Sequence, residues 1–348
     1  MPEDIALTFP YTAFDLTEQV NVVPNMYGLV NELNLFPSEG STSTIIEIRY
    51  VNGALRVLPV KERGSAATPM KADSGKTIFV ECPHFPSLDL ITPKDLQDVL
   101  VIVGGTKQPK TLEDRVAEKL FDIRNTHAIT REWLRAQALQ GNILDGNLTS
   151  FLNLYTVFNI SNSPLDFDLG NASADIVGKC STIFQNITSN LKGETMRGIE
   201  AIVDKDFFQN FVTHAKVEKY YTQAEQALAL ANLARNQSAG NMWGRVFTFQ
   251  NITFREYYGT APTGAGGNTS TPFWPSKTGT AYPVGTQNMF RTYDAPPNDI
   301  RFANTVGQEV YISPEILEHG QGIELKSESN ALPICKRPEA LQQLVSNT

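Results

Sequence analysis

The feature that most constrains the fold is one long amphipathic segment, residues 111–139. Thr111 and Asp114 stand at the N-cap and capping-box positions of a helix, and Gly141 follows its end. At 1.5 Å per residue, such a helix is roughly 43 Å long, which suits a spine crossing a flat subunit. Apolar residues recur at the spacing of one helix face: Leu112, Val116, Leu120, Ile123, His127 and Leu134, widened by Phe121, Ile129 and Trp133.

The rest of the chain predicts a mixed α+β fold, because strand and helix periods follow one another without a βαβ repeat. Residues 259–287 are rich in Gly, Thr and Pro, with Lys277 the only charge, and are typical of a surface loop or an insertion. Pro338 is expected to open a short final helix. We expect strands at 148–160, 199–203, 245–257, 309–313 and 322–335, and further helices at 172–192, 205–214 and 217–236.

A basic β excursion precedes the spine. Residues 46–50 alternate between apolar and charged side chains up to Asn52-Gly53, a strong hairpin signal, and a further strand returns at 77–82. Between these strands, residues 61–76 are mostly small or polar. The tip of the excursion therefore cannot form a core of its own, and it is either mobile or packed on another chain. Six bases stand against two acids, Glu62 and Asp73, and the bases are Arg49, Arg56, Lys61, Arg63, Lys71 and Lys76.

The first forty residues have the opposite charge, with six acids and no Lys or Arg. Prolines 10, 24 and 37 are expected to break any regular element there. We therefore predict an extended arm whose aromatics, including Phe9, Tyr11 and Phe14, need a surface to lie on. The alternative is an ordinary strand-and-loop start within the fold.

Composition excludes several classes of function. A net charge of −8 argues against sequence-independent nucleic-acid binding, which depends on Lys and Arg neutralising phosphates. No apolar run is long enough to cross a bilayer, and the acidic N-terminus does not resemble an export signal. Three scattered cysteines, Cys82, Cys180 and Cys335, fit buried thiols in a reducing compartment.

No catalytic or metal-binding motif is complete. The Gly75-Lys76-Thr77 run resembles the end of a phosphate-binding loop, but the required earlier glycine is Met70. Cys82 and His84 would supply only two ligands, whereas a closed zinc site needs four. His127 falls on the apolar face of the spine and is expected to be a structural histidine. We therefore expect no enzyme activity, no cofactor and no metal.

Three blocks near the C-terminus carry a family resemblance. They read YPVGTQNMFRTYDAPP at 282–297, FANTVGQEVY at 302–311 and GIELKSESNALPICKRPEAL at 322–341. In this order and spacing they resemble the closing segment of the phage major capsid protein E family, to which the lambda shell protein belongs. The upstream order of arm, β excursion, long helix and α/β region is similar too, so the resemblance covers nearly the whole chain.

The resemblance implies the Hong Kong 97-type capsid fold, in which the arm and an extended β loop reach across neighbouring subunits. Carried over to this chain, it implies an N-terminal arm at 1–40 and an extended loop at 43–83. A peripheral domain would comprise 84–170 and 315–348, with the spine helix at 111–139. An axial domain would comprise 171–314. The nine interface residues expected are the six bases of the excursion and the three arm aromatics named above.

The function implied is that of a tailed-phage major capsid protein, assembling as pentamers and hexamers into an icosahedral shell around double-stranded DNA without specific DNA binding. A separate scaffold protein, a portal and a decoration protein are the expected partners, and no membrane is involved. Assembly would occur in the host cytoplasm and the product would be the virion capsid. Two alternatives are a cellular nanocompartment shell of the same fold that encloses a cargo enzyme, and a plain soluble enzyme.

Overall fold

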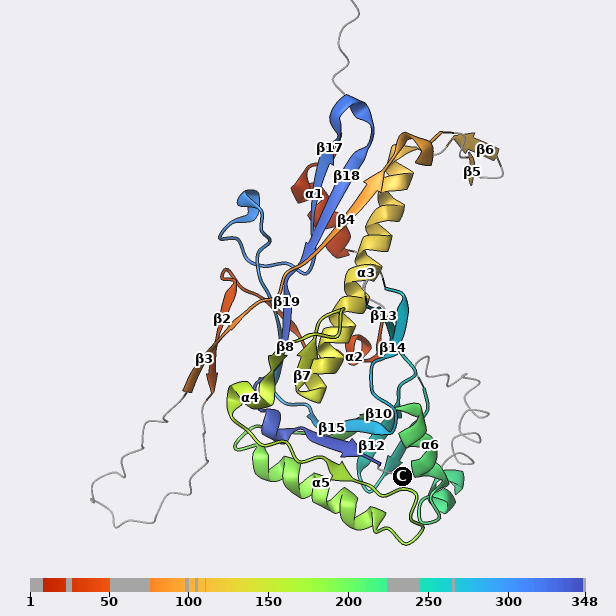
Figure 1. Ribbon diagram of the computed structural model, residues 1–348, viewed down its shortest axis with the longest axis vertical. Helices are drawn as coiled ribbons and strands as arrows, with labels where there is room; N and C mark the ends of the chain where they lie inside the picture. Colours follow the sequence, from red (N-terminus) through yellow and green to blue (C-terminus); the bar gives the residue numbers. More distant parts are fainter. Residues whose placement is uncertain are drawn as a thin grey trace, which may run out of the picture.

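The computed structural model describes residues 9–22, 27–50, 76–97, 100–103, 106–109, 111–223, 244–264 and 267–346, and these form an elongated α+β body (Figure 1). The helices are α1 (Ala13–Val22), α2 (Leu29–Glu32), α3 (Leu112–Gln140), α4 (Leu154–Phe158), α5 (Ile176–Asn190) and α6 (Lys205–Thr213). The strands are β1 (Ser38–Gly40), β2 (Ile45–Tyr50), β3 (Lys76–Glu81), β4 (Phe85–Ile91), β5 (Leu100–Val103), β6 (Thr106–Pro109), β7 (Asn142–Leu144), β8 (Ser150–Asn153), β9 (Leu165–Asp166), β10 (Gly198–Val203), β11 (Val246–Phe249), β12 (Ile252–Glu256), β13 (Thr260–Thr263), β14 (Thr269–Pro272), β15 (Thr278–Val284), β16 (Phe290–Asp294), β17 (Tyr311–Ile316), β18 (Ile323–Ser329), β19 (Ala331–Cys335) and β20 (Gln342–Val345).

The wide end of the body is a six-stranded mixed sheet in the order β11-β12-β10-β15-β20-β9. Strand β10 pairs parallel with β12 and antiparallel with β15, so residues far apart in the sequence meet at its centre. Helices α5 and α6 bury their apolar faces on this sheet (Figure 1). Phe207, Phe211 and Phe254 pack against one another in that core, where each fully buried ring contributes about 1.5–3 kcal/mol.

The narrow end is a three-stranded antiparallel sheet in the order β17-β18-β4. One face of the sheet is covered by α1 and by the first half of α3, which together form a separate apolar core. Leu16 of α1, Leu120 of α3 and Leu325 of β18 are buried there. The opposite face leaves Leu88 and Leu90 of β4 exposed at 62% and 40%.

Helix α3 connects the two ends and confirms the predicted spine. Thr111 and Asp114 form the expected capping box, and Gly141 ends the helix with a left-handed φ of 82°. Its first half shows the predicted buried face, whereas residues 131–139 are buried all round because they pass between the sheets. Phe121 was wrongly placed on the buried face. It is 55% exposed because it lies one residue, about 100°, around the helix from Leu120.

The middle of the body is held by a small sheet in the order β1-β16-β19. Strand β1, near the start of the chain, pairs parallel with β16, and β16 pairs antiparallel with β19. The largest apolar core surrounds it and joins the buried half of α3 to the roots of β2 and β3.

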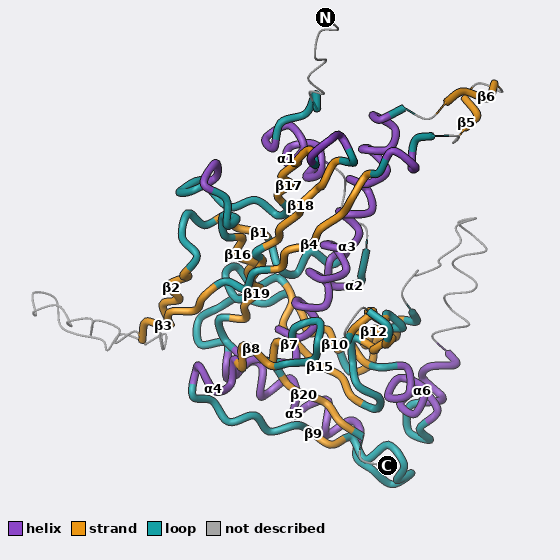
Figure 2. Tube along the Cα trace, turned by 45° about the horizontal axis from the view of Figure 1, so that its top comes forward, coloured by secondary structure: helices purple, strands orange, loops and turns teal. Residues whose placement is uncertain are grey.

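Strands β2 and β3 form a two-stranded ribbon that leaves the body on one side, while β5 and β6 project beyond the start of α3 on the other (Figures 1 and 2). The return strand predicted near residue 77 is therefore confirmed as β3. The predicted Asn52-Gly53 turn and the basic tip lie outside the described residues.

The expectation of no regular element in the first forty residues was wrong. Helix α1 lies between Pro10 and Pro24, which bound the helix instead of interrupting it. Thr12 and Asp15 cap it reciprocally, since each side chain accepts the other's backbone N–H, at 3.2 and 2.9 Å. The apolar side of α1 packs on β17, so this part of the arm belongs to its own subunit.

Residues 259–287 also differ from the prediction of a surface loop. They form the hairpin β13–β14 and then β15, an inner strand of the six-stranded sheet. Threonine is β-branched and favours strands, and Phe273 and Trp274 are buried. Gly279 is needed for close packing, because a Cβ there would lie 2.5 Å from Val203.

Two shorter predictions were right only in part. The expected strand at 148–160 is β8 followed by helix α4, where the Asn153 side chain caps the helix through the N–H of Thr156. Pro338 opens a single 3₁₀ turn, after which the chain continues as strand β20. The expected helices at 172–192 and 205–214 are confirmed as α5 and α6.

Candidate assembly surfaces and the polar cluster behind them

The root of the β2–β3 ribbon has two unlike faces. Ile46, Ile48, Ile78 and Val80 point inward and are buried in the central core. On the outward face, Ile45 and Phe79 are 53% and 67% exposed, next to the exposed carboxylates of Glu47 and Glu81. One chain therefore leaves an apolar and acidic surface uncovered where the ribbon begins.

Two of the six predicted basic residues belong to the described strands of this ribbon. Arg49 lies near the end of β2 opposite Thr77, and Lys76 opens β3 opposite Tyr50. The other four, Arg56, Lys61, Arg63 and Lys71, lie outside the described residues.

The three arm aromatics contact their own chain to different extents. Phe9 and Tyr11 meet edge to face with centroids 5.4 Å apart and pack against the core between α1, α3 and β18. The ring of Phe14 contacts that of Phe302, with centroids 4.6 Å apart, but Phe14 remains 57% exposed. Two of the predicted interface side chains thus cover an intramolecular core, and the third presents most of its ring to the outside.

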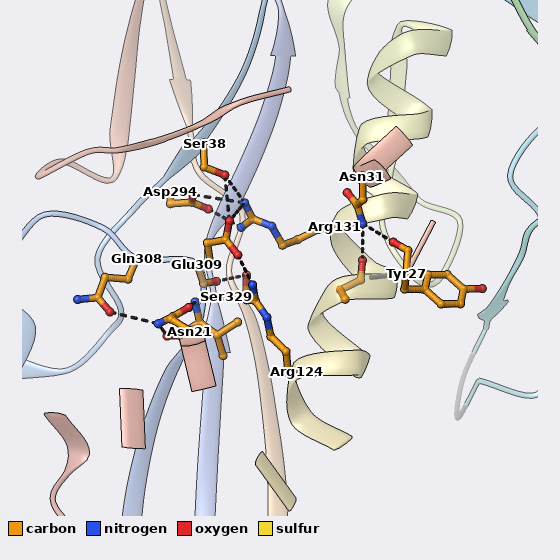
Figure 3. A network of polar contacts seen from close by, with 12 residues as sticks. Asn21, Tyr27, Asn31, Ser38, Arg124, Arg131, Asp294, Gln308, Glu309 and Ser329 are labelled. Atoms are coloured by element: carbon orange, nitrogen blue, oxygen red, sulfur yellow. Dashed lines mark hydrogen bonds and ion pairs between the residues drawn. The ribbon is translucent and has the colours of Figure 1, made fainter. Parts of the chain in front are cut away.

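A buried polar cluster fixes the arm, the spine and the central sheet to one another (Figure 3). Arg131 of α3 lies 2.5 Å from Asp294 of β16 and donates to the Ser38 hydroxyl of β1 at 2.8 Å. Glu309 accepts from Arg131 at 3.4 Å and from Arg124 at 2.6 Å. Arg131 and Asp294 are only 1% and 2% exposed, so their charges are compensated almost wholly by each other and by these neighbours.

The electrostatics of the cluster favour the charged forms. Burial alone would raise the pKa of Glu309, but Arg131 and Arg124 outweigh it and lower that pKa to about 2. Burial and the proximity of Arg131 lower the pKa of Arg135 to about 10, which leaves it protonated at neutral pH. Arg135 donates to the Asn31 side chain at 2.6 Å, so helix α2 of the arm is bonded to the spine as well.

Glu132 forms a second link between arm and spine. Its carboxylate accepts the backbone N–H groups of Val30 and Asn31 at 2.9 and 2.8 Å, and the hydroxyl of Tyr257 at 2.9 Å. It therefore caps the short helix α2 from the side of α3. Burial raises the pKa of Glu132 to about 7 in spite of these hydrogen bonds. Gly28 has a φ of 99°, and a Cβ there would strike the Glu132 side chain at 2.1 Å.

His127 and the three cysteines, which the sequence also offered, are buried. His127 is buried and its Nε2 lies 3.0 Å from the Ser327 hydroxyl, which confirms a core histidine. Burial, helped by Arg124 and Arg131, lowers the pKa of His127 to about 4, so the ring is neutral at pH 7. All three cysteines are free and buried, as the sequence predicted.

Sequence reasoning missed both the outward face of the ribbon and the polar cluster. The first had a usable signal, because Ile45, Glu47, Phe79 and Glu81 follow the period of one strand face. For the polar cluster, the sequence shows only the basic side, because Arg124, Arg131 and Arg135 share a helix face. Their partner Asp294 lies 163 residues from Arg131, so the pairing cannot be read from the sequence.

The described residues contain neither a metal-binding cluster nor a membrane-spanning helix. Within the ranges given above, no cluster of three or more His, Cys, Asp or Glu residues could hold a metal ion. None of the helices seen in those ranges has both the length and the apolar character of a membrane span.

Comparison with known proteins accounts for these features. The family described as phage major capsid protein E matches residues 12–346. The major capsid protein of Salmonella phage Felix O1 is 29% identical over 347 residues, covering 94% of each chain. That of Pseudomonas phage KPP10 is 26% identical and covers 95% of each. A prophage capsid protein from Escherichia coli CFT073 superposes with a TM-score of 0.58 at 11% identity, covering 97% of this chain and 100% of its own.

A mature capsid subunit of bacteriophage PhiM1 gives a TM-score of 0.50 at 13% identity, covering 93% of this chain and 88% of its own. The fold is therefore the Hong Kong 97-type capsid fold. The family match adds the class of protein, a shell-building subunit. The chain belongs to the phage major capsid protein E family. Its role is structural: it is a phage major capsid protein that associates with copies of itself into the capsid of the virion. A cellular nanocompartment is not favoured.

Proposed function

We propose that this capsid protein forms pentamers and hexamers of an icosahedral shell around packaged double-stranded DNA. In this proposal the arm is residues 1–40 and the extended loop is 43–83. The peripheral domain comprises 84–170 with 315–348, and the axial domain comprises 171–314. The two separate cores, one on the six-stranded sheet and one under the β17-β18-β4 sheet, support a division of this kind.

The observation that carries the proposal is the β2–β3 ribbon. It leaves the body as two strands, buried on one face and uncovered on the other, with Ile45 and Phe79 exposed. The segment that it leads into carries an excess of four positive charges between Arg49 and Lys76. Such a segment has too few apolar residues to fold on itself, so we place it on a neighbouring subunit.

The neighbour offers acidic surfaces to receive it. The outer side of the first half of α3 exposes Glu113, Asp114, Glu118 and Asp122, and the arm carries six acids without a base. Each exposed pair contributes only about 0–1 kcal/mol, but a capsomer repeats the contact in every subunit. Salt weakens such pairs, because screening acts within about 10 Å at 0.1 M.

Other partners follow from the same role. A separate scaffold protein would direct assembly in the host cytoplasm, and a portal would occupy one vertex. A decoration protein on the outer surface belongs to the same set of proposed partners. The DNA would be enclosed without specific binding, which agrees with a net charge of −8. No catalytic activity is proposed.

The test replaces Lys61, Arg63, Lys71 and Lys76 with Ser together. The free subunit should keep its circular dichroism spectrum and its melting temperature, because a segment so rich in small and charged residues has little apolar surface to contribute to a core. Its shells should fail to form or should fall apart at salt concentrations that the parent shells survive, as seen by electron microscopy and light scattering.

A matched variant controls for the loss of four charges. Lys94, Lys205, Lys216 and Lys219 are exposed elsewhere on the subunit, and their replacement with Ser should leave assembly unchanged. Shells of the loop variant that are as salt-resistant as those of this control would show that the loop charges only keep the segment soluble.

A further inference from the structure

Ile300 is an apolar knob that no described part of its own subunit covers. It is 92% exposed, more than any other large apolar side chain in the described ranges. It opens a 3₁₀ turn, Ile300–Phe302, in the loop between β16 and β17. A fully exposed isoleucine at one position is unremarkable on a monomer, so its significance depends on how firmly it is held.

Contacts on both sides of Ile300 anchor the turn that carries it. Asp299 caps the turn by accepting the N–H of Arg301 at 3.0 Å, and the Arg301 guanidinium pairs with the same carboxylate and reaches the Ser313 hydroxyl on β17. Phe302 is buried against Tyr311 with ring centroids 5.1 Å apart. The turn is thus anchored on both sides, and Ile300 is presented on a fixed support.

The same subunit has an apolar pocket that no side chain in the described ranges fills. It lies at the far end of the β17-β18-β4 sheet and has a volume of about 300 Å³. That is room for about ten water molecules at about 30 Å³ each, enough for an isoleucine side chain. Every lining residue is uncharged, and the walls include Phe9, Ile91, Leu112, Ile316 and Ile323. We call it the sheet-end pocket.

The knob cannot reach the pocket of its own chain. Phe302 and Arg301 rest on Tyr311 and Ser313, which point to one face of β17 near its start. Ile316 lines the pocket from the other end of that strand and, by the alternation of side chains, from the other face. The loop before β17 and the β17–β18 turn accordingly lie apart in Figure 1.

We infer that Ile300 of one subunit inserts into the sheet-end pocket of a second copy. The occupant is a copy of this chain because a shell holds such copies side by side, and because knob and pocket are both uncharged and of compatible size. Two different patches meet, so the contact is heterologous, the type that forms a ring when the rotation between neighbours closes. The inference rests on the shell-building role and adds the residues of one contact.

The test uses cysteine pairs in assembled shells, with particles scored separately by electron microscopy. Subunits carrying both Ile300→Cys and Ile316→Cys should, on mild oxidation, give a ladder of covalent dimers, trimers and longer chains on a non-reducing gel. Ile316 is 37% exposed, so a thiol there is accessible, and the three native cysteines are buried. Either single variant alone should give no ladder, and shells co-assembled from the two single variants should give crosslinked dimers and nothing longer.

Intact shells without crosslinks in the double variant would overturn the contact while leaving the shell-building role untouched. Crosslinking of Ile300→Cys with itself would also overturn it, since that outcome needs a contact between like patches. A second measurement does not depend on cysteine. Ile300→Asp should lower shell yield at least tenfold relative to Val22→Asp, a matched change at a side chain 77% exposed. Equal yields from these two variants would refute the inference.

Discussion

Arg131→Met tests whether the buried cluster fixes the spine to the central sheet. The change keeps most of the side-chain volume and removes the charge. Asp294, 2% exposed, would then lose the cation that it contacts, and Glu309 would keep its ion pair with Arg124 and the more distant charge of Arg135. Removing one partner of a buried ion pair typically costs about 3–5 kcal/mol, because the remaining charge is left without compensation.

The measurement is urea unfolding of the free subunit at pH 7, followed by circular dichroism. Arg301→Met is the matched control, since it breaks another Arg–Asp pair whose arginine side chain is 44% exposed. An exposed pair contributes about 0–1 kcal/mol, so this control should unfold close to the parent. A second variant, Arg131→Met with Asp294→Leu, should regain much of the loss because neither charge of the pair remains.

Two results would refute the reasoning. If Arg131→Met costs no more than Arg301→Met, the buried pair does not hold the sheet to the spine. If the double variant is destabilised by the sum of its two single changes, the loss comes from packing and not from an uncompensated charge, because coupled residues should deviate from additivity.

Three further predictions concern the spine. Leu120→Asp should destabilise the free subunit by several kcal/mol by placing a charge in an apolar core, whereas Phe121→Asp, at an exposed position, should stay within about 0.5 kcal/mol in the same unfolding assay. Because the folded pKa of Glu132 lies near 7, above its ordinary value of 4.5, its contribution to stability is greatest in acid and is lost as pH rises through 7. Glu132→Gln should remove that part of the slope between pH 5 and 7, and an unchanged slope in pH-dependent unfolding would contradict the assignment. Gly141→Ala should lower the melting temperature, because the left-handed backbone is strained for alanine and its Cβ would lie 2.2 Å from a tyrosine ring.

The sequence predicted those helices whose ends and buried faces are determined by residues within a few positions of one another. The bounds of α3 follow from Thr111, Asp114 and Gly141, which act within one turn of the helix ends. The buried face of α5 follows in the same way from the spacing of Ile176, Cys180, Ile183 and Ile187.

What could not be predicted depends on partners far away in the sequence. Strand β15 has no periodic signal of its own, and its identity is set by pairing with β10 and β20. The charged residues of α3 look like a solvated helix face until Asp294 and Glu309 are placed beside them. The fold that these long-range contacts build was predicted from the family resemblance and not from local patterns.

The position of β19 and β20 has a consequence for the order of events during synthesis. Residues 331–335 complete the central sheet by pairing with β16, and residues 342–345 enter the six-stranded sheet between β15 and β9. At about 5–20 residues per second, translation of the preceding chain takes many seconds, during which neither sheet is complete. A nascent subunit therefore cannot complete both sheets before residues 331–345 have been made, so copies that stop short of these residues lack β19 or β20 and should not reach the native fold.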